Sequence, residues 1–320
     1  MNDPTPVCIV GAGPAGTSAA LKLAYHGIRC VLIDKATFPR DKICGDAVSG
    51  KVTTLLNRLD PDIIRRFEAE PIKVDVWGIQ FFAPNGIPME IPFVPAPGSD
   101  LPGAPGYVSR RWDFDHFMVR EVARRPEVEL ILGKAVKDYR RLPEGWEVHL
   151  EGGEAIRTRL LLVADGAHSR FSRHVAGLPT EKKHHAGAVR AYYRGVTGMD
   201  PRGFIELHFL KELTPGYFWI FPLPNGAANV GLGMRSDYIS KRRVNLRKAF
   251  EQVVQEHPVL SRRFAQAERE GPVQGYGLPL GSGRYRISGD HYMLLGDAAH
   301  LVDPLTGEGI GNGFYSGFIA

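Results

Sequence analysis

The stretch VCIVGAGPAG, residues 7–16, decides the fold of this 320-residue chain. It joins a short apolar run to a glycine-rich turn, and a helical pattern then extends from Pro14 to about His26. A second apolar run, CVLID, follows at residues 30–34. This order predicts a β–α–β unit with a tight entry turn, which is the start of a parallel, doubly wound sheet.

The three glycines of the turn suit a nucleotide pyrophosphate. Gly11 permits the tight turn, Gly13 lets the backbone approach a phosphate, and Gly16 lets the helix pack closely on the strand. The helix N-terminus then offers free N–H groups and the positive end of its dipole. Asp34 closes the second strand, where a carboxylate can accept hydrogen bonds from a ribose. The sequence predicts a dinucleotide site, and this fingerprint alone does not distinguish FAD from NAD.

Two later segments also place an aspartate and a glycine at the end of an apolar strand. LLLVADGAHSR, which ends at Arg170, places Asp165 and Gly166 at the end of a buried strand, with Ser169 entering a helix. LLGDAAH, residues 294–300, precedes DPLTGEGI, residues 303–310. An aspartate at the end of a strand can bind ribityl hydroxyls, and a glycine-rich turn can offer N–H groups to a flavin ring or a pyrophosphate. Together these segments favour FAD.

Strand patterns of a second kind occur in two separate blocks, at about 72–100 and 184–280. The first contains a hairpin signal at Asn85-Gly86, followed by a proline-rich loop from Pro95 to Pro105. The second is a run of alternating strands, then a helix of about 25 residues, the segment GYGLPL and the buried strand YMLLGD.

We therefore expect an α/β fold in which a Rossmann-like cofactor domain with a parallel sheet carries an inserted, mainly antiparallel substrate-domain sheet. The cofactor domain is discontinuous and comprises residues 1–71, 101–183 and 281–320. The substrate domain comprises residues 72–100 and 184–280. Because the chain ends inside a helix that has just begun, we also expect that a C-terminal segment is missing.

Composition narrows the class of protein. The net charge is +5, but the basic residues are scattered and not interleaved with aromatics, so we expect solvated helix faces and no nucleic-acid partner. No apolar run reaches the roughly 18 residues of a membrane-spanning helix, and no signal peptide is visible, which favours the cytoplasm. The three cysteines form neither a disulfide framework nor a zinc site, and no spacing indicates a metal.

Five motifs in this order resemble the flavoprotein superfamily of para-hydroxybenzoate hydroxylase. Three are the glycine–aspartate segments above. Two further segments resemble one branch, the geranylgeranyl reductase family: FPRDKICG, residues 38–45, and GYFWIFP, residues 216–222. Arg111, ahead of a Phe-Asp pair, also matches that family. The resemblance covers essentially the whole chain. The chain departs from the pattern at Asp46, where a glycine is frequent, and at Gly313, where a helical alanine is usual.

The resemblance implies non-covalent FAD, reduced by NADPH or NADH, and transfer of a hydride to a carbon–carbon double bond in a prenyl chain. It places Asp34, Arg111 and Asp297 on the FAD, and Cys44 near the isoalloxazine. Cys44, Tyr217 and Trp219 are the candidates for a catalytic or pocket-lining role. The predicted cofactor contacts are Gly11, Gly13, Pro14, Ala15, Gly16, Asp34, Lys35, Arg40, Cys44, Gly45, Arg111, Asp165, Gly166, Gly296, Asp297, Pro304, Gly307, Gly309 and Ile310. The expected partner is an apolar small molecule, and a peripheral membrane contact stays open because prenyl substrates live in lipid.

Alternatives remain at this point. The same fold supports a flavin monooxygenase that hydroxylates aromatic rings, and a halogenase, whose motif usually has tryptophan at both positions occupied here by Tyr217 and Trp219. A flavin-binding electron carrier needs no substrate site at all. Cys44 can equally be an inert loop thiol, and alternating aromatics on a strand often mean core packing. The pair His184-His185 suits a domain junction better than a proton donor.

Overall fold

The computed structural model describes residues 4–93 and 103–320, so most of the expected proline-rich loop lies outside the described residues, as do parts of three expected domain segments. The first sheet has the order β17-β18-β11-β1-β2-β8. Four neighbouring strands of this sheet are parallel: β11 (Ala155–Val163), β1 (Thr5–Val10), β2 (Cys30–Asp34) and β8 (Val128–Leu132). Helix α1 (Pro14–Tyr25) connects β1 to β2. The predicted doubly wound start of the chain is confirmed.

Both faces of this sheet are covered, which explains why its strands are continuously apolar. Ile9 on one face belongs to an apolar cluster that also includes buried residues of α1, α2 (Gly50–Leu59), α3 (Pro61–Glu68) and α4 (Arg111–Ala123). Cys8 on the other face packs against Trp146 of the β9–β10 hairpin (Val136–Leu142, Gly145–Leu150) and against α5 (Arg170–His174). Cys8 and Cys30 are free and buried, and burial raises the pKa of both thiols.

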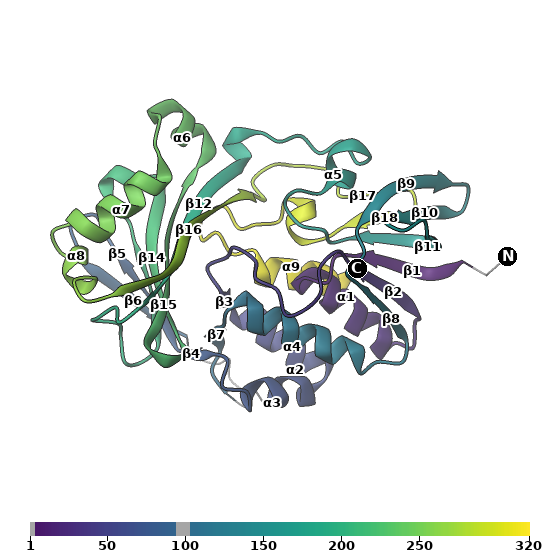
Figure 1. Cartoon of the computed structure of the whole chain (residues 1–320), viewed down its shortest axis with the longest axis horizontal. Coiled ribbons are helices and arrows are strands. Elements are labelled where there is room, and N and C mark those ends of the chain that lie inside the picture. Colours follow the sequence, from purple (N-terminus) through teal and green to yellow (C-terminus); the bar gives the residue numbers. More distant parts are fainter. Residues whose placement is uncertain (1–3, 94–102) are drawn as a thin grey trace.

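The second sheet has the order β16-β12-β15-β14-β13-β5-β6 and lies at the opposite end of the molecule (Figure 1). Its strands are β5 (Gly78–Phe82), β6 (Pro88–Pro92), β12 (His185–Arg194), β13 (Phe204–His208), β14 (Gly216–Leu223), β15 (Ala227–Arg235) and β16 (Glu268–Pro279). All pairings are antiparallel except β13 with β5. The two predicted blocks of strands thus join in one mainly antiparallel sheet, and the predicted hairpin connects β5 to β6.

The predicted helix of about 25 residues after this sheet is wrong. The segment forms three short helices, α6 (Ser236–Arg242), α7 (Leu246–Glu256) and α8 (Leu260–Arg263). Arg243 has a φ of 53°, which ends α6, and the Asn245 side chain accepts a hydrogen bond from the Lys248 N–H, which starts α7 afresh. Pro258 follows α7 and prevents its continuation. The three helices cover one face of the second sheet, where Phe250 and Phe264 are buried.

Two smaller expectations also need correction. The segment YMLLGD is not a fully buried strand: β18 (Tyr292–Leu294) is next to the edge strand β17 (Ser288–Gly289), and Met293 is 36% exposed. The sequence after the loop of residues 35–50 also predicts one helical stretch to about Ala69, but the structure has two helices there, α2 and α3, since Asp60 caps α3. A third, small sheet of β3 (Ala47–Val48), β7 (Gly106–Val108) and β4 (Val74–Val76) has strands too short to leave a sequence pattern.

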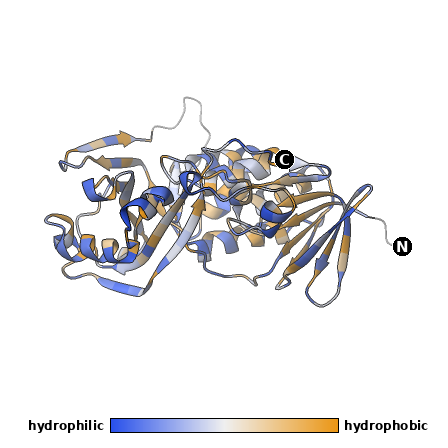
Figure 2. Cartoon of the chain, turned by 90° about the horizontal axis from the view of Figure 1, so that it is seen from above, coloured by the Kyte–Doolittle hydropathy of each residue, from blue (hydrophilic) through white to orange (hydrophobic). Residues whose placement is uncertain are grey.

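The last helix, α9 (Ile310–Ile319), packs against α1 at the centre of the molecule (Figure 1). Its glycines permit this contact: a Cβ on Gly317 would lie 2.0 Å from the Ala15 carbonyl oxygen. Figure 2 shows hydrophobic colours concentrated along the strands that converge on the middle of the molecule. No helix in the described part of the chain is long and apolar enough to cross a bilayer.

Candidate flavin and substrate cavity

A cavity of about 860 Å³ extends from the end of the first sheet to the open face of the second. This volume lies in the range of about 300–1,000 Å³ that is usual for ligand sites. The glycine turn after β1, the loop of residues 40–49, the turn after β11 and the segment 295–310 line one end, and β12, β13 and β14 line the other. The cavity therefore joins the predicted nucleotide motifs to the aromatic strand.

The three glycines of the turn differ in what surrounds them. A Cβ on Gly11, where φ is +104°, would lie 2.3 Å from the Ala164 carbonyl oxygen, and one on Gly16 would lie 1.8 Å from that of Gly11. A Cβ on Gly13 would meet only the Arg111 guanidinium, at 3.9 Å. Gly11 and Gly16 are therefore required by the fold itself, whereas Gly13 leaves open space at the N-terminus of α1.

Asp34 orders the turn from the neighbouring strand. Its Oδ2 accepts a hydrogen bond from the Ala12 N–H at 2.7 Å, and its Oδ1 accepts one from the Ala36 N–H at 2.8 Å. The carboxylate is partly exposed and lines the cavity. It thus has free lone pairs that face the place where a ribose would lie beside the turn.

The turn after β11 carries the second aspartate. Asp165 faces the cavity, and removal of bulk water by the surrounding protein raises its pKa to about 6. Ser169 caps α5 through the Ser172 N–H, as predicted, so the turn is fixed on its far side. Asp165 and Gly166 both line the cavity.

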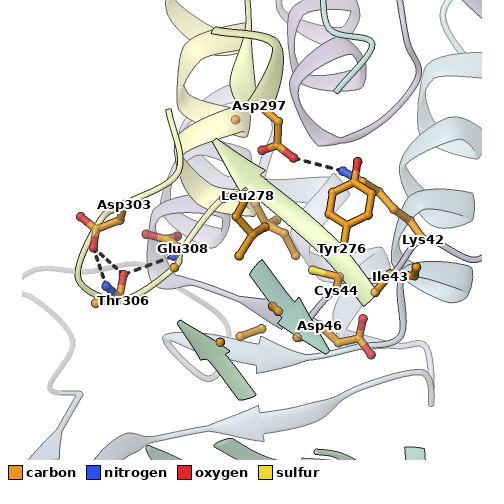
Figure 3. Close-up of a pocket in the computed structure, with 18 of the residues that line it drawn as sticks. Lys42, Ile43, Cys44, Asp46, Tyr276, Leu278, Asp297, Asp303, Thr306 and Glu308 are labelled. Carbon is orange, nitrogen blue, oxygen red and sulfur yellow. Dashed lines mark hydrogen bonds and ion pairs between the residues drawn. The ribbon is translucent and has the colours of Figure 1, made fainter. Parts of the chain in front are cut away.

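The third motif forms the wall opposite the loop of residues 40–49. Asp297 Oδ2 accepts from Lys42 Nζ at 3.4 Å, and this pair spans the cavity beside Tyr276 (Figure 3). Asp303 Oδ1 accepts hydrogen bonds from the Thr306 N–H at 2.7 Å and the Thr306 hydroxyl at 2.8 Å. These bonds shape the turn that leads to the N-terminus of α9, which is aimed at the cavity.

Arg111 lies beneath the cavity in a buried ion-pair cluster. Its Nε and Nη2 donate to the two carboxylate oxygens of Asp115 at 2.7 and 2.6 Å, and Arg40 contacts the same carboxylate at 2.8 Å. Burial alone would lower the pKa of Arg111, but the Asp115 charge raises it above the ordinary value. The cluster ties the first turn of α4 to the loop that carries Cys44 and keeps a net positive charge under the cavity.

Tyr217, Trp219 and Phe221 of β14 share one face of the strand and all line the cavity. Phe218 and Ile220 point to the opposite face and pack under the covering helices. The alternation of these aromatics along β14 therefore does not mean closed core, because the face that they share lines the cavity.

The loop that carries Cys44 rests on this aromatic face. A Cβ on Gly45 would lie 3.3 Å from the Phe221 ring and 3.8 Å from the Trp219 indole nitrogen. Cys44 is partly exposed, and Tyr276 stands close by in the same wall (Figure 3). The two segments that resemble the geranylgeranyl reductase family, residues 38–45 and 216–222, thus contact each other in the wall of the cavity.

The structure brings nearly all predicted site residues to this cavity. Those that line it are Gly11, Gly13, Pro14, Ala15, Asp34, Lys35, Arg40, Cys44, Gly45, Arg111, Asp165, Gly166, Tyr217, Trp219, Gly296, Asp297, Pro304, Gly307, Gly309 and Ile310. Gly16 is the exception, since it is buried between α1 and β1. His184 and His185 do not line it, and instead contact Ser282 and Ser236.

Sequence reasoning missed several residues of the cavity. Lys42 and Tyr276 were not selected, because a lysine in a charged loop and a tyrosine in a strand have no distinctive spacing. Asn229, which does not line the cavity but is buried behind Trp219 and Cys44, was also missed although it carried a signal: it is a lone amide within the apolar strand AANVGLGM. Among residues 4–93 and 103–320, no group of His, Cys, Asp and Glu is arranged to hold a metal ion.

The residues present fit FAD. The open space at Gly13 and the N-termini of α1 and α9 suit a pyrophosphate, and Asp34 suits a ribose. Asp165 and Asp297 offer carboxylate oxygens to hydroxyl groups. Beyond these residues the cavity extends to the apolar face of β14, which leaves space for a substrate beside a flavin ring. Fold and cavity together define a flavoprotein with an FAD-binding domain.

Comparison with known proteins agrees with this class. A model of the FAD binding domain matches residues 4–197, and one of the geranylgeranyl reductase catalytic domain matches residues 188–267. The chain is 33% identical to a menaquinone reductase of Mycobacterium tuberculosis, over 100% of this chain and 76% of that protein. It is 33% identical to digeranylgeranylglycerophospholipid reductase 2 of Methanopyrus kandleri, over 98% and 75%. The chain belongs to the geranylgeranyl reductase family of FAD-dependent oxidoreductases.

Solved structures give the same result. A geranylgeranyl bacteriochlorophyll reductase-like protein of Thermoplasma acidophilum superposes with a TM-score of 0.81 at 25% identity, covering 98% of this chain and 76% of that one. A flavin-dependent brominase superposes with a TM-score of 0.80 at 26% identity, covering 98% and 77%. The fold class and the FAD-dependent oxidoreductase predicted from the sequence are confirmed.

Proposed function

We propose that this protein reduces carbon–carbon double bonds in a prenyl chain, with FAD as the bound cofactor and NADPH or NADH as the source of electrons. The observation that carries the proposal is the single cavity that joins a nucleotide-binding end to an apolar face lined by Tyr217, Trp219 and Phe221. Such a face can bind a long apolar chain but offers few polar groups to a hydrophilic substrate.

FAD, when bound, supplies the hydride chemistry, and the protein supplies binding, orientation and exclusion of water. Gly13 and the N-terminus of α1 would hold the pyrophosphate, while Asp34, Asp165 and Asp297 would hold hydroxyl groups. The Cys44–Gly45 backbone would border the flavin ring, and Trp219 would support the substrate. In this proposal residues 1–71, 101–183 and 281–320 form the cofactor domain, and residues 72–100 and 184–280 form the substrate domain.

The head group of the substrate is the finer part of the proposal. One relative is named for menaquinone and another for a digeranylgeranyl lipid, and both compounds carry prenyl chains. We propose the prenyl chain as the shared feature that the sheet recognises. The place of action would be the cytoplasm, at the membrane surface where such chains are found.

The test is steady-state oxidation of NADPH or NADH by the FAD-loaded protein with different acceptors, under anaerobic conditions for the prenyl compounds and in a separate aerated arm with bromide and an aromatic acceptor. We expect turnover with geranylgeranyl diphosphate or menaquinone and a product that has gained two hydrogens in the prenyl chain. A brominase-like activity is the alternative favoured by the structural likeness, and it predicts turnover only with oxygen, bromide and an aromatic acceptor. Consumption of NADPH without an organic product under any of these conditions would contradict both the reductase and the brominase activity. It would favour a flavin-binding electron carrier.

A further inference from the structure

Asp46 occupies an unusual position behind the loop that borders the cavity. Its φ is +67°, in the left-handed region that a non-glycine residue seldom adopts. Its side chain is completely buried, and its Oδ1 has no hydrogen-bond partner among the described residues. A strained backbone conformation and a buried oxygen without a hydrogen-bond partner both lower the stability of the fold. Such features are found preferentially at functional sites.

The other oxygen of this carboxyl connects the loop to two strands of the second sheet. Asp46 Oδ2 accepts a hydrogen bond from the Tyr192 hydroxyl of β12 at 2.8 Å. It accepts a second one from Asn229 Nδ2 of β15, also at 2.8 Å. Figure 3 places Asp46 on the same loop as Cys44 and Lys42, with its carboxyl directed away from them. The side chain therefore holds the loop from behind.

Asn229 extends this connection to the floor of the cavity. Its Nδ2 also donates to the Cys44 carbonyl oxygen at 2.7 Å, and its Oδ1 accepts from the Trp219 indole N–H at 2.9 Å. An indole N–H can only donate, so the amide orientation is fixed. The Trp219 ring occupies the space beside β15 that a side chain at Gly231 would fill. One fully buried amide thus joins Asp46, the Cys44 backbone and the Trp219 ring.

The charges around Asp46 make its ionisation sensitive to the environment. Burial raises its pKa to about 6, while the hydrogen bonds from Asn229 and Tyr192 and the charges of Arg190 and Arg111 oppose that rise. Arg190 is itself buried and pairs with Asp41 of the same loop at 2.8 Å. The groups facing the carboxyl thus come from β12, β15, α4 and its own loop.

We propose that Asp46 is a positioning residue, which through Asn229 holds the Cys44–Gly45 backbone and the Trp219 ring in one fixed relation. The two groups are neighbours in the cavity wall, since a Cβ on Gly45 would lie 3.8 Å from the Trp219 indole nitrogen, and the inference rests on the proposed function for the identity of what they hold. The ionised carboxylate is the better hydrogen-bond acceptor. The connection is therefore tighter above the pKa of Asp46 than below it.

The test uses the Trp219 indole N–H and needs no substrate. The protein is labelled with ¹⁵N-tryptophan, and the Trp219 signal among the four tryptophans is assigned by its loss in Trp219→Phe. We expect this signal to shift with pH, with a midpoint near the Asp46 pKa of about 6, and to exchange slowly with solvent. Asp46→Asn keeps an acceptor and tolerates the positive φ, so it should remove the titration and keep slow exchange. Asp46→Gly should speed the exchange by about tenfold or more.

Tyr192→Phe is the matched control, because it removes one donor from the same carboxyl and leaves Asn229 in place. It should move the midpoint and keep the slow exchange of the Trp219 signal. Asn229→Leu cuts the connection from the sheet side and should reproduce Asp46→Gly, which covers the case in which one variant fails to fold. A Trp219 signal that neither titrates in the wild type nor changes in Asp46→Gly would overturn the inference.

Turnover gives a second, separate readout. With the prenyl substrate, Asp46→Gly should lower kcat by about tenfold or more and change the Kd for FAD much less, since misplacement of groups at the reacting centre costs rate more than cofactor binding. Asp46→Asn should restore most of kcat above pH 7. Absence of turnover with any prenyl compound would refute the proposed function alone, because the Trp219 signal still decides the role of Asp46.

Discussion

The two ends of the cavity are built by different means. At the first sheet, backbone groups, glycines without side chains and buried ion pairs form the walls, so a small change in backbone position is costly. At the second sheet, aromatic side chains form the floor and one buried amide supports them from behind, and most of the binding surface is apolar. The first end is suited to one polar cofactor of fixed shape. The second is lined by side chains that can be exchanged without moving the backbone, and the relatives are named for two different compounds, menaquinone and digeranylgeranylglycerophospholipid.

The largest effect is expected from the glycines of the turn. Gly16→Val would place a Cβ 1.8 Å from the Gly11 carbonyl oxygen, so helix and strand must separate, at a cost of about 3 kcal/mol or more. Gly13→Ala meets open space in the protein and should fold normally but lower FAD affinity by about tenfold or more. Thermal unfolding and flavin absorbance of both variants check this. Equal loss of stability in the two would contradict the distinction between them.

A loss of stability of similar size is expected from Asp115→Asn, which leaves the buried Arg111 without its anionic partner. Removing one partner of a buried pair costs about 3–5 kcal/mol, and Arg40 loses the same contact. Urea denaturation of the apoprotein should measure this loss. Asp62→Asn, at an exposed ion pair with Arg65, is the control and should change stability by less than about 1 kcal/mol.

The pH dependence of stability should also differ between the two ends of the cavity, represented by Asp46 and Asp165. The folded-state pKa of Asp46 is raised to about 6 by burial, so its contribution is most favourable below the unfolded value of 3.8 and is lost as pH rises to about 6. This loss amounts to about 3 kcal/mol at most, and Asp46→Asn should remove it. Asp165→Asn should change the slope less, because Asp165 is exposed to solvent, which weakens the effect of burial on its pKa, whereas Asp46 is fully buried. A slope unchanged in Asp46→Asn would contradict this reading of its burial.

The smallest effect is expected where the two ends touch. The Tyr217 hydroxyl donates to the Thr306 carbonyl oxygen, which joins β14 to the turn before α9. Tyr217→Phe should lower stability by about 1 kcal/mol, the usual net value of such a bond. The rate of proteolysis within residues 303–309 should rise at the same time. Tyr238→Phe, on the covering helix α6, is the comparison variant and should leave that rate unchanged.

The sequence predicted the first end of the cavity better than the second for a physical reason. A nucleotide site of this type needs glycines at fixed spacing and an acid at the end of the next strand. Gly11, Gly13, Gly16 and Asp34 can therefore be recognised from their spacing in the sequence. The hydrogen bond from Asn229 to the Cys44 carbonyl oxygen joins two residues that lie 185 positions apart in the chain, and no local sequence pattern predicts it. The error at residues 236–263 has a local cause, since Arg243 adopts a left-handed conformation that its side chain does not predict.

The most direct test of the account is a single turnover of the reduced, FAD-loaded protein with geranylgeranyl diphosphate in the absence of oxygen. The account predicts that the flavin absorbance returns at the rate at which the prenyl chain gains two hydrogens, with one double bond saturated per flavin. A flavin that stays reduced in the presence of geranylgeranyl diphosphate and of menaquinone, and is reoxidised only by oxygen, would contradict it.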